Sequence, residues 1–189
     1  MEIIDVLAIC GSTREKSFNR ALTLAARDLA PDPFRVEVWD DHTGLPHVEA
    51  APGRPFPAAV GALRDRVSRA DILLLVTPEL NRNIPGRLKD IVDWLSVPAP
   101  PRPLMGRPVM LMSASPNRFG GAFAQLQLAD LLRRAGAEVL TDLDVTVGSA
   151  HRHVDDAGNL VGEEPRHEVA QLWRRLLART ADGRQAVPV

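Results

Sequence analysis

The sequence contains no tyrosine, few other aromatic residues and almost no net charge. Three Trp and five Phe make up the aromatic complement of 189 residues, and 23 Lys and Arg balance 24 Asp and Glu. Binding of single-stranded nucleic acid needs aromatic stacking platforms and a cationic groove, and acidic membranes also attract positive charge. The composition therefore argues against a nucleic-acid partner and against a membrane partner.

Cysteine and long apolar runs are scarce as well. The single Cys10 lies in an apolar segment, which excludes a disulfide within one chain and favours a small buried side chain. No apolar run approaches the roughly 20 residues of a membrane span, and the first residues lack the basic region and cleavage site of a secretory signal. We expect a cytoplasmic protein with a single domain over 1–189, whose tail frays from about Thr180.

Apolar segments of strand length alternate with segments of helical spacing along the chain. Residues 72–76 read Ile-Leu-Leu-Leu-Val without alternation, which is typical of a parallel strand covered on both faces. The pattern predicts an α/β fold: a flavodoxin-like, doubly wound, five-stranded parallel sheet in the order 2-1-3-4-5, with helices on both faces. The predicted strands are 3–10, 34–39, 72–76, 109–112 and 138–140. The predicted loops are 40–57 and 142–164, and the Pro-rich segment 98–108 is expected to be a stiff connection within the domain.

The first predicted strand runs into a polar segment that opens a helix. Residues 11–19 read Gly-Ser-Thr-Arg-Glu-Lys-Ser-Phe-Asn. Hydroxyls and cations beside the free N–H groups of a helix N-terminus suit a phosphate monoester. The alternative is an ordinary turn with Ser17 or Asn19 as the helix N-cap. The segment has neither the G-x-G-x-x-G fingerprint nor a P-loop, so a mononucleotide fits it better than a dinucleotide.

Two further polar loops follow the third and fourth predicted strands. Residues 77–86 offer a proline, backbone groups and two side-chain amides, and residues 113–121 offer hydroxyls, an amide and a Gly-Gly pair that lets a flat ring approach the backbone. In the predicted order, ligands bind where the winding reverses, at the carboxyl ends of the first and third strands. We therefore expect the three loops to meet in one crevice that holds a planar heterocycle with a single phosphate, as FMN has.

These three motifs, in this order, resemble those of the NADPH-dependent FMN reductase family, which includes related quinone, chromate and azo-dye reductases. The resemblance spans about 3–140 and implies bound FMN, NADPH or NADH as co-substrate, and a small-molecule electron acceptor such as a quinone or a flavin. It also implies ping-pong hydride transfer through the flavin, and a homodimer or homotetramer. The flavin would carry the chemistry, so no protein residue is expected to be catalytic and no metal site is expected.

The resemblance also implies a set of FMN-binding residues. They are Ser12, Arg14, Ser17, Phe18 and Asn19 in the first loop, Pro78, Glu79, Leu80 and Asn81 in the second, and Ser113, Ser115, Asn117, Gly120 and Gly121 in the third.

The sequence departs from the family pattern at two of these positions. The family often has an aromatic residue where Leu80 stands, and usually has glycine where Asn117 stands; asparagine tolerates a positive φ better than most residues. Two alternatives to a reductase stay open: an electron carrier, against which the near-neutral charge argues, and a family member that has lost flavin binding. Arg82, Arg87 and Arg118 are candidates for the 2′-phosphate of NADPH.

We assign no functional role to four of the histidines. His42 and His47 are expected to be exposed to solvent, and the pair His151 and His153 has metal-ligand spacing but no further ligand nearby, so it is left without a role.

Overall fold

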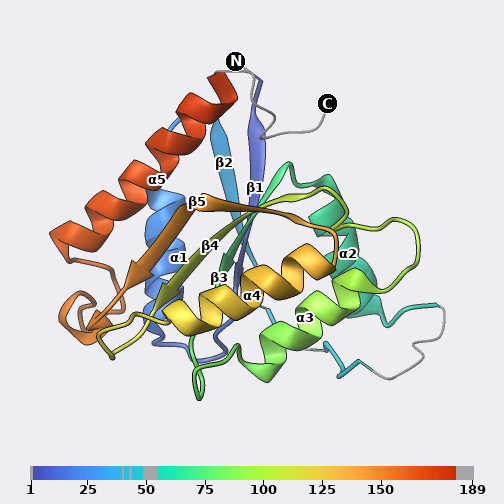
Figure 1. Ribbon diagram of the computed structural model, residues 1–189, viewed down its shortest axis with the longest axis horizontal. Coiled ribbons are helices and arrows are strands. Elements are labelled where there is room, and N and C mark those ends of the chain that lie inside the picture. The colour runs from blue at the N-terminus through green and yellow to red at the C-terminus, as the bar shows by residue number, and fades with distance from the viewer. Residues whose placement is uncertain (1, 40, 43, 49–54, 182–189) are drawn as a thin grey trace.

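The computed structural model describes residues 2–39, 41–42, 44–48 and 55–181. Its strands form a parallel sheet in the order β2-β1-β3-β4-β5, which confirms the predicted topology (Figure 1). The strands are β1 (Ile4–Cys10), β2 (Phe34–Trp39), β3 (Ile72–Val76), β4 (Pro108–Ala114) and β5 (Glu138–Val147). The helices are α1 (Phe18–Asp28), α2 (Ala58–Arg69), α3 (Gly86–Ser96), α4 (Ala122–Arg134) and α5 (Glu163–Ala181), with a 3₁₀ turn η1 (Ala150–Arg152).

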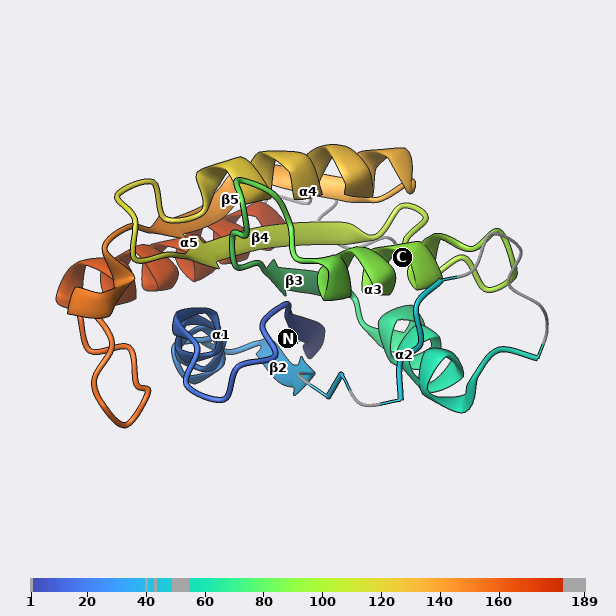
Figure 2. The ribbon, with the colours of Figure 1, turned by 90° about the horizontal axis from the view of Figure 1, so that it is seen from below.

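Alternating side chains of the strands face two separate apolar layers. Val6 and Ala8 point toward the layer covered by α1 and α5, whereas Leu7 and Ile9 point toward the layer covered by α2, α3 and α4. Figure 2 shows the helices divided between the two faces in this way. Every side chain of β3 is buried, as expected for a central parallel strand.

The carboxyl ends of β1, β3 and β4 lie side by side. Cys10 pairs with Val76, and Val76 pairs with Met112. The ladder continues one step into the loops, because Gly11 N donates to Val76 O at 2.8 Å and Thr77 N donates to Met112 O at 2.9 Å. The three polar loops therefore start from neighbouring points at one edge of the sheet.

The last strand is longer than predicted. Residues 142–147 belong to β5, although the sequence pattern placed them in a loop. The strand bulges, since Val139 pairs with Val109 but Asp144 pairs with Leu111. The bulge interrupts the alternation of buried and exposed side chains along the strand. The alternation is regular only in the second half, where Leu143, Val145 and Val147 are buried.

Two other boundaries also shift. Strand β4 includes Ser113 and Ala114, which were expected in the loop, and α5 begins at Glu163, so the last two residues of the predicted loop 142–164 are helical. At the other end, α5 includes Thr180, and residues 182–189 of the predicted frayed tail lie outside the described residues.

A buried arginine fixes the Pro-rich connection after α3. Arg64 is 2% exposed and donates to the carbonyl oxygens of Trp94, Ala99 and Pro101, each at 2.6 Å. These acceptors include the last turn of α3, whose carbonyl groups lack partners within the helix. The segment is thus held against α2.

Candidate functional site

The first loop joins β1 to α1 and presents a polar turn at the helix N-terminus. Ser17 is the N-cap of α1, and its Oγ accepts from Asn19 N at 3.2 Å. Ser12 and Ser17 are almost buried, whereas Thr13 and Arg14 are exposed. The guanidinium of Arg14 makes no ion pair in the described part of the chain. The structure therefore confirms Ser17 as the N-cap, and the Thr13 and Arg14 side chains stay accessible to an anion, whose binding here stays a prediction.

Asn19 has a different surrounding from the other residues of this loop. It is 2% exposed, its Nδ2 donates to Ala114 O at 2.8 Å, and its Oδ1 accepts from Ala114 N at 2.9 Å. This reciprocal pair joins the start of α1 to the end of β4. Both ends of the amide are thus engaged with backbone, and we interpret Asn19 as the residue that positions the first loop beside the third.

The second loop contains a tight hairpin. Leu80 and Asn83 exchange two backbone hydrogen bonds of 2.9 Å, and the two residues between them, Asn81 and Arg82, have φ values of 52° and 58°. Two consecutive left-handed residues are the signature of a type I′ turn, for which asparagine is well suited at the first position. Leu80 is exposed at the base of this hairpin, while Pro78 and Glu79 are half-buried below it.

The third loop is shaped by its two glycines. Gly120 and Gly121 have φ values of 62° and 95°. A Cβ on Gly120 would lie 2.6 Å from Thr146 Cγ2, and one on Gly121 would lie 2.9 Å from Ser113 Cβ. The glycines are therefore required by the fold itself, because the loop packs directly on β4 and β5.

Asn117 is not among the left-handed residues, so its presence needs another reason than a positive φ. Its Oδ1 accepts from Phe119 N at 2.8 Å, its backbone O accepts from Ser149 N at 2.9 Å, and its Nδ2 lies 3.3 Å from Glu79 Oε1. The sequence analysis explained Asn117 by its tolerance of a left-handed turn. The structure explains it by its hydrogen bonds instead.

The three loops meet as predicted. Asn19 links the first loop to the end of β4, and Glu79 links the second loop to the third. The three loops therefore start side by side at the carboxyl ends of β1, β3 and β4 and are linked to one another by these contacts; a crevice between them and its contacts with FMN stay predictions.

One residue that supports the third loop was missed by the sequence analysis. Gln125 is buried in α4, and its Nε2 donates to Ser113 Oγ at 2.8 Å, to Val145 O at 2.7 Å and to Thr146 Oγ1 at 3.0 Å. It holds the end of β4, the end of β5 and the start of α4 together. The sequence feature that could have revealed Gln125 is its position three residues before Leu128, which places a polar side chain on the core-facing side of a helix.

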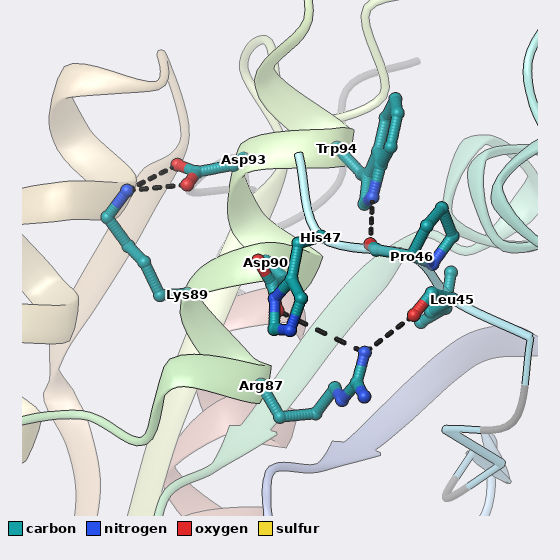
Figure 3. Close-up of polar contacts among 8 residues, drawn as sticks. All are labelled: Leu45, Pro46, His47, Arg87, Lys89, Asp90, Asp93 and Trp94. Carbon is teal, nitrogen blue, oxygen red and sulfur yellow. Dashed lines mark hydrogen bonds and ion pairs between the residues drawn. The ribbon is translucent and has the colours of Figure 1, made fainter. Parts of the chain in front are cut away.

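The guanidinium of Arg87, a candidate for the 2′-phosphate of NADPH, is engaged in contacts within the protein. Its Nη1 donates to Leu45 O at 2.6 Å and lies 4.0 Å from Asp90 Oδ2 (Figure 3). His47 Nδ1 lies 2.8 Å from the same carboxylate oxygen, and Trp94 Nε1 donates to Pro46 O at 2.8 Å. Helix α3 thus fastens residues 45–47. The other two candidate arginines, Arg82 and Arg118, are exposed.

The guanidinium groups of these two arginines lie over aromatic rings. Arg82 is 5.3 Å from the ring centroid of Phe123, and Arg118 is 4.6 Å from that of Phe119.

The two histidines of the loop after β2 are less free than expected. The prediction for His47 holds in part, since its side chain is 84% exposed but is paired with Asp90. The prediction for His42 is wrong, because the residue is half-buried and its ring lies edge-on to Trp39, with the centroids 5.2 Å apart.

A cavity of about 960 Å³ lies elsewhere, between β5 and α5. Its lining includes the carboxyl groups of Asp144, Glu163, Glu164 and Glu168. Burial, together with the charge of Glu164, raises the pKa of the Glu168 carboxyl. A phosphate group would be repelled from such a surface. Across the described residues, no three His, Cys, Asp or Glu side chains are grouped to bind a metal, and no helix is long and apolar enough to span a membrane.

The Asn19 contacts predict a stability effect that is independent of any ligand. Replacing Asn19 by Ala leaves the N–H and C=O of Ala114 without partners in the core, which should lower the free energy of unfolding by about 2–4 kcal/mol. Urea unfolding of the FMN-free protein measures it. Asn159→Ala, at an exposed amide, serves as the control and should cost less than about 1 kcal/mol. Equal effects of the two substitutions would contradict the positioning role of Asn19.

Comparison with known proteins agrees with this geometry. The model of the NADPH-dependent FMN reductase family matches residues 4–152. An NAD(P)H-dependent FMN reductase of Pseudomonas aeruginosa is 36% identical over 181 residues, covering 92% of this chain and 97% of the relative. A quinone reductase of Escherichia coli K12 is 33% identical and covers 82% of each chain.

A solved structure shares the fold. FerB, a flavoenzyme NAD(P)H:(acceptor) oxidoreductase from Paracoccus denitrificans, superposes with a TM-score of 0.83 at 24% identity, covering 95% of this chain and 98% of that one. With the sheet order, the three motifs and the family match in agreement, this chain belongs to the NADPH-dependent FMN reductase family.

Proposed function

We propose that this chain is an NAD(P)H-dependent, FMN-containing oxidoreductase that reduces small-molecule acceptors of the quinone or flavin type. The observation that carries the proposal is the linking of the three motif loops by Asn19 and Glu79 at one edge of the sheet, in a member of this family. Relatives named quinone reductase and 2-hydroxy-1,4-benzoquinone reductase support the acceptor class.

The groups of the first loop fit a phosphate monoester. The turn offers the hydroxyls of Ser12 and Thr13, the guanidinium of Arg14, and the N-terminus of α1. A Cβ on Gly11 would lie 3.1 Å from Val76 O and 3.0 Å from Leu88 Cδ2. Glycine therefore allows the turn to fold closely against β3. We assign the FMN phosphate to this turn.

The second and third loops are assigned to the isoalloxazine ring. Bound FMN would supply the hydride transfer between NAD(P)H and the acceptor. The residues of this chain that would hold and orient the ring are Pro78 and the hairpin at Leu80 in the second loop, and Ser115 and the segment at Asn117 in the third. No side chain of the crevice is needed as an acid or a base for hydride transfer.

Several broader assignments belong to the same proposal. We infer a single FMN-binding domain, because the helices of both layers pack on one sheet. We also infer a cytoplasmic location, where NAD(P)H is the common reductant, and no nucleic-acid or membrane partner, because the charge is balanced.

The absorbance spectrum of the purified protein tests the function. We expect flavin absorption after reconstitution with FMN and desalting, bleaching by NADPH or NADH under anaerobic conditions, and steady-state oxidation of the nucleotide when a quinone is added. A protein that stays colourless after mixing with FMN would overturn the proposal. Retained flavin without turnover would instead identify an electron carrier, and comparison of the two nucleotides gives the co-substrate preference.

Replacement of Arg14 tests the phosphate assignment. Because a charge-assisted hydrogen bond contributes about 1.5–3 kcal/mol, Arg14→Ala should weaken FMN binding roughly tenfold to a hundredfold. Titration of the FMN-free protein by flavin fluorescence measures the Kd. The exposed Arg174, on α5, provides the control: Arg174→Ala should leave the Kd unchanged. An unaltered Kd in Arg14→Ala would remove Arg14 from the site.

We also propose a homodimer or homotetramer whose contact surface includes exposed apolar residues beside the crevice. The Phe119 and Phe123 rings lie 5.7 Å apart edge to face, Leu126 follows one turn along α4, and Leu80 lies on the hairpin whose Arg82 carbonyl accepts from Gln127. Exposed aromatic and leucine side chains of this kind are typical of contact surfaces.

Sedimentation analysis tests the oligomeric state. We expect a particle of two or four chains, and Leu126→Glu should reduce the number of chains in the particle because it places a charge in the contact surface. A wild-type monomer at micromolar concentration would contradict the proposal.

A further inference from the structure

Helix α4 begins without a capping side chain of its own. Its N-cap is Gly121, which has no side chain to accept from the first-turn N–H groups. A cap serine, threonine or aspartate would normally provide that acceptor. Here the acceptor comes from the second loop, because Ala124 N donates to Glu79 Oε2 at 3.3 Å. The position is electrostatically favourable as well, since a carboxylate lies at the positive end of the helix dipole.

The other carboxylate oxygen of Glu79 is engaged from the third loop. Asn117 Nδ2 donates to Glu79 Oε1 at 3.3 Å, while Asn117 Oδ1 accepts from Phe119 N within its own loop. The side chain of Asn117 therefore uses one atom to shape the third loop and the other to reach the second. A glycine, the usual family residue at this position, has no side chain that could make either contact.

We propose that Glu79 and Asn117 are a pair of positioning residues that holds the second and third loops together as a preformed cradle for the isoalloxazine ring. The inference rests on the proposed function, and it changes the role that the sequence resemblance implied for Glu79 and Asn117, from ligands of the flavin to a bridge between loops. A cradle that is already assembled binds with a smaller loss of conformational entropy, so the pair contributes to FMN affinity without touching FMN.

Exchanging the carboxylate of Glu79 and the amide of Asn117 distinguishes the positioning role from direct binding of FMN. Asn117→Asp keeps the acceptor for Phe119 N–H but removes the donor and places a second carboxylate against Glu79. Glu79→Gln keeps an acceptor for Ala124 N–H, and in the double variant the new amide of the second loop can donate to the new carboxylate of the third. Asn159→Asp provides the matched control, because Asn159 Nδ2 likewise donates to a carboxylate, that of Asp155, in an exposed loop.

We expect the FMN Kd of Asn117→Asp to rise about tenfold, and that of Glu79→Gln to rise about threefold or less. The double variant should return to within about threefold of wild type, and Asn159→Asp should not change the Kd. If Glu79 binds FMN directly, Glu79→Gln should show the largest loss and the double variant should be weaker still. That result, or an unchanged Kd in Asn117→Asp, would overturn the proposal.

Measurements without flavin keep the inference separate from the proposed function. In the FMN-free protein, amide hydrogen exchange at Ala124 should accelerate in Asn117→Asp and return toward the wild-type rate in the double variant. If wild type fails to bind FMN, the proposed function fails while this rescue still supports the bridge between the loops. If wild type binds FMN but exchange at Ala124 is the same in all variants, the bridge is wrong and the proposed function stands.

Discussion

Burial of β3 on both faces is the constraint from which the rest of the structure follows. Each side chain from Ile72 to Val76 is apolar and buried, so helices must cover the sheet on both sides. Because crossovers between parallel strands keep one hand, the chain must leave β1 in opposite directions to reach β2 and β3. The loops after β1 and β3 therefore start side by side but lead to helices on opposite faces of the sheet, and ligands bind at such a point in doubly wound folds.

The polar groups of these loops serve two purposes. Asn19, Glu79 and Gln125 are engaged with backbone or side-chain atoms of neighbouring elements, so the loops hold their positions without a ligand. Thr13 and Arg14 instead extend from the turn into solvent. The division agrees with a cradle that is assembled in advance and keeps a small number of free groups for an anion, an arrangement that reduces the entropy lost on binding.

The departures from the family pattern acquire a physical meaning in this arrangement. Asn117 does not adopt the left-handed conformation; its amide organises the third loop and reaches Glu79. The left-handed residues are Asn81 and Arg82, which turn the hairpin next to Leu80. A leucine at that position lacks an aromatic face for stacking, and because it is exposed we include it in the apolar surface that we assign to subunit contact.

The sequence by itself determined the sheet order, the apolar layers and the three loops that meet at one edge, because periodicity and the order of motifs are local properties. It did not reveal the full β5, since a bulge breaks the alternation there. It also could not assign the partners of the polar side chains. Asn19 bonds to Ala114, 95 residues away, and Arg87 to Leu45, 42 residues away. Only the tertiary structure decides which predicted ligands are already engaged within the protein, because such contacts depend on how the finished layers pack.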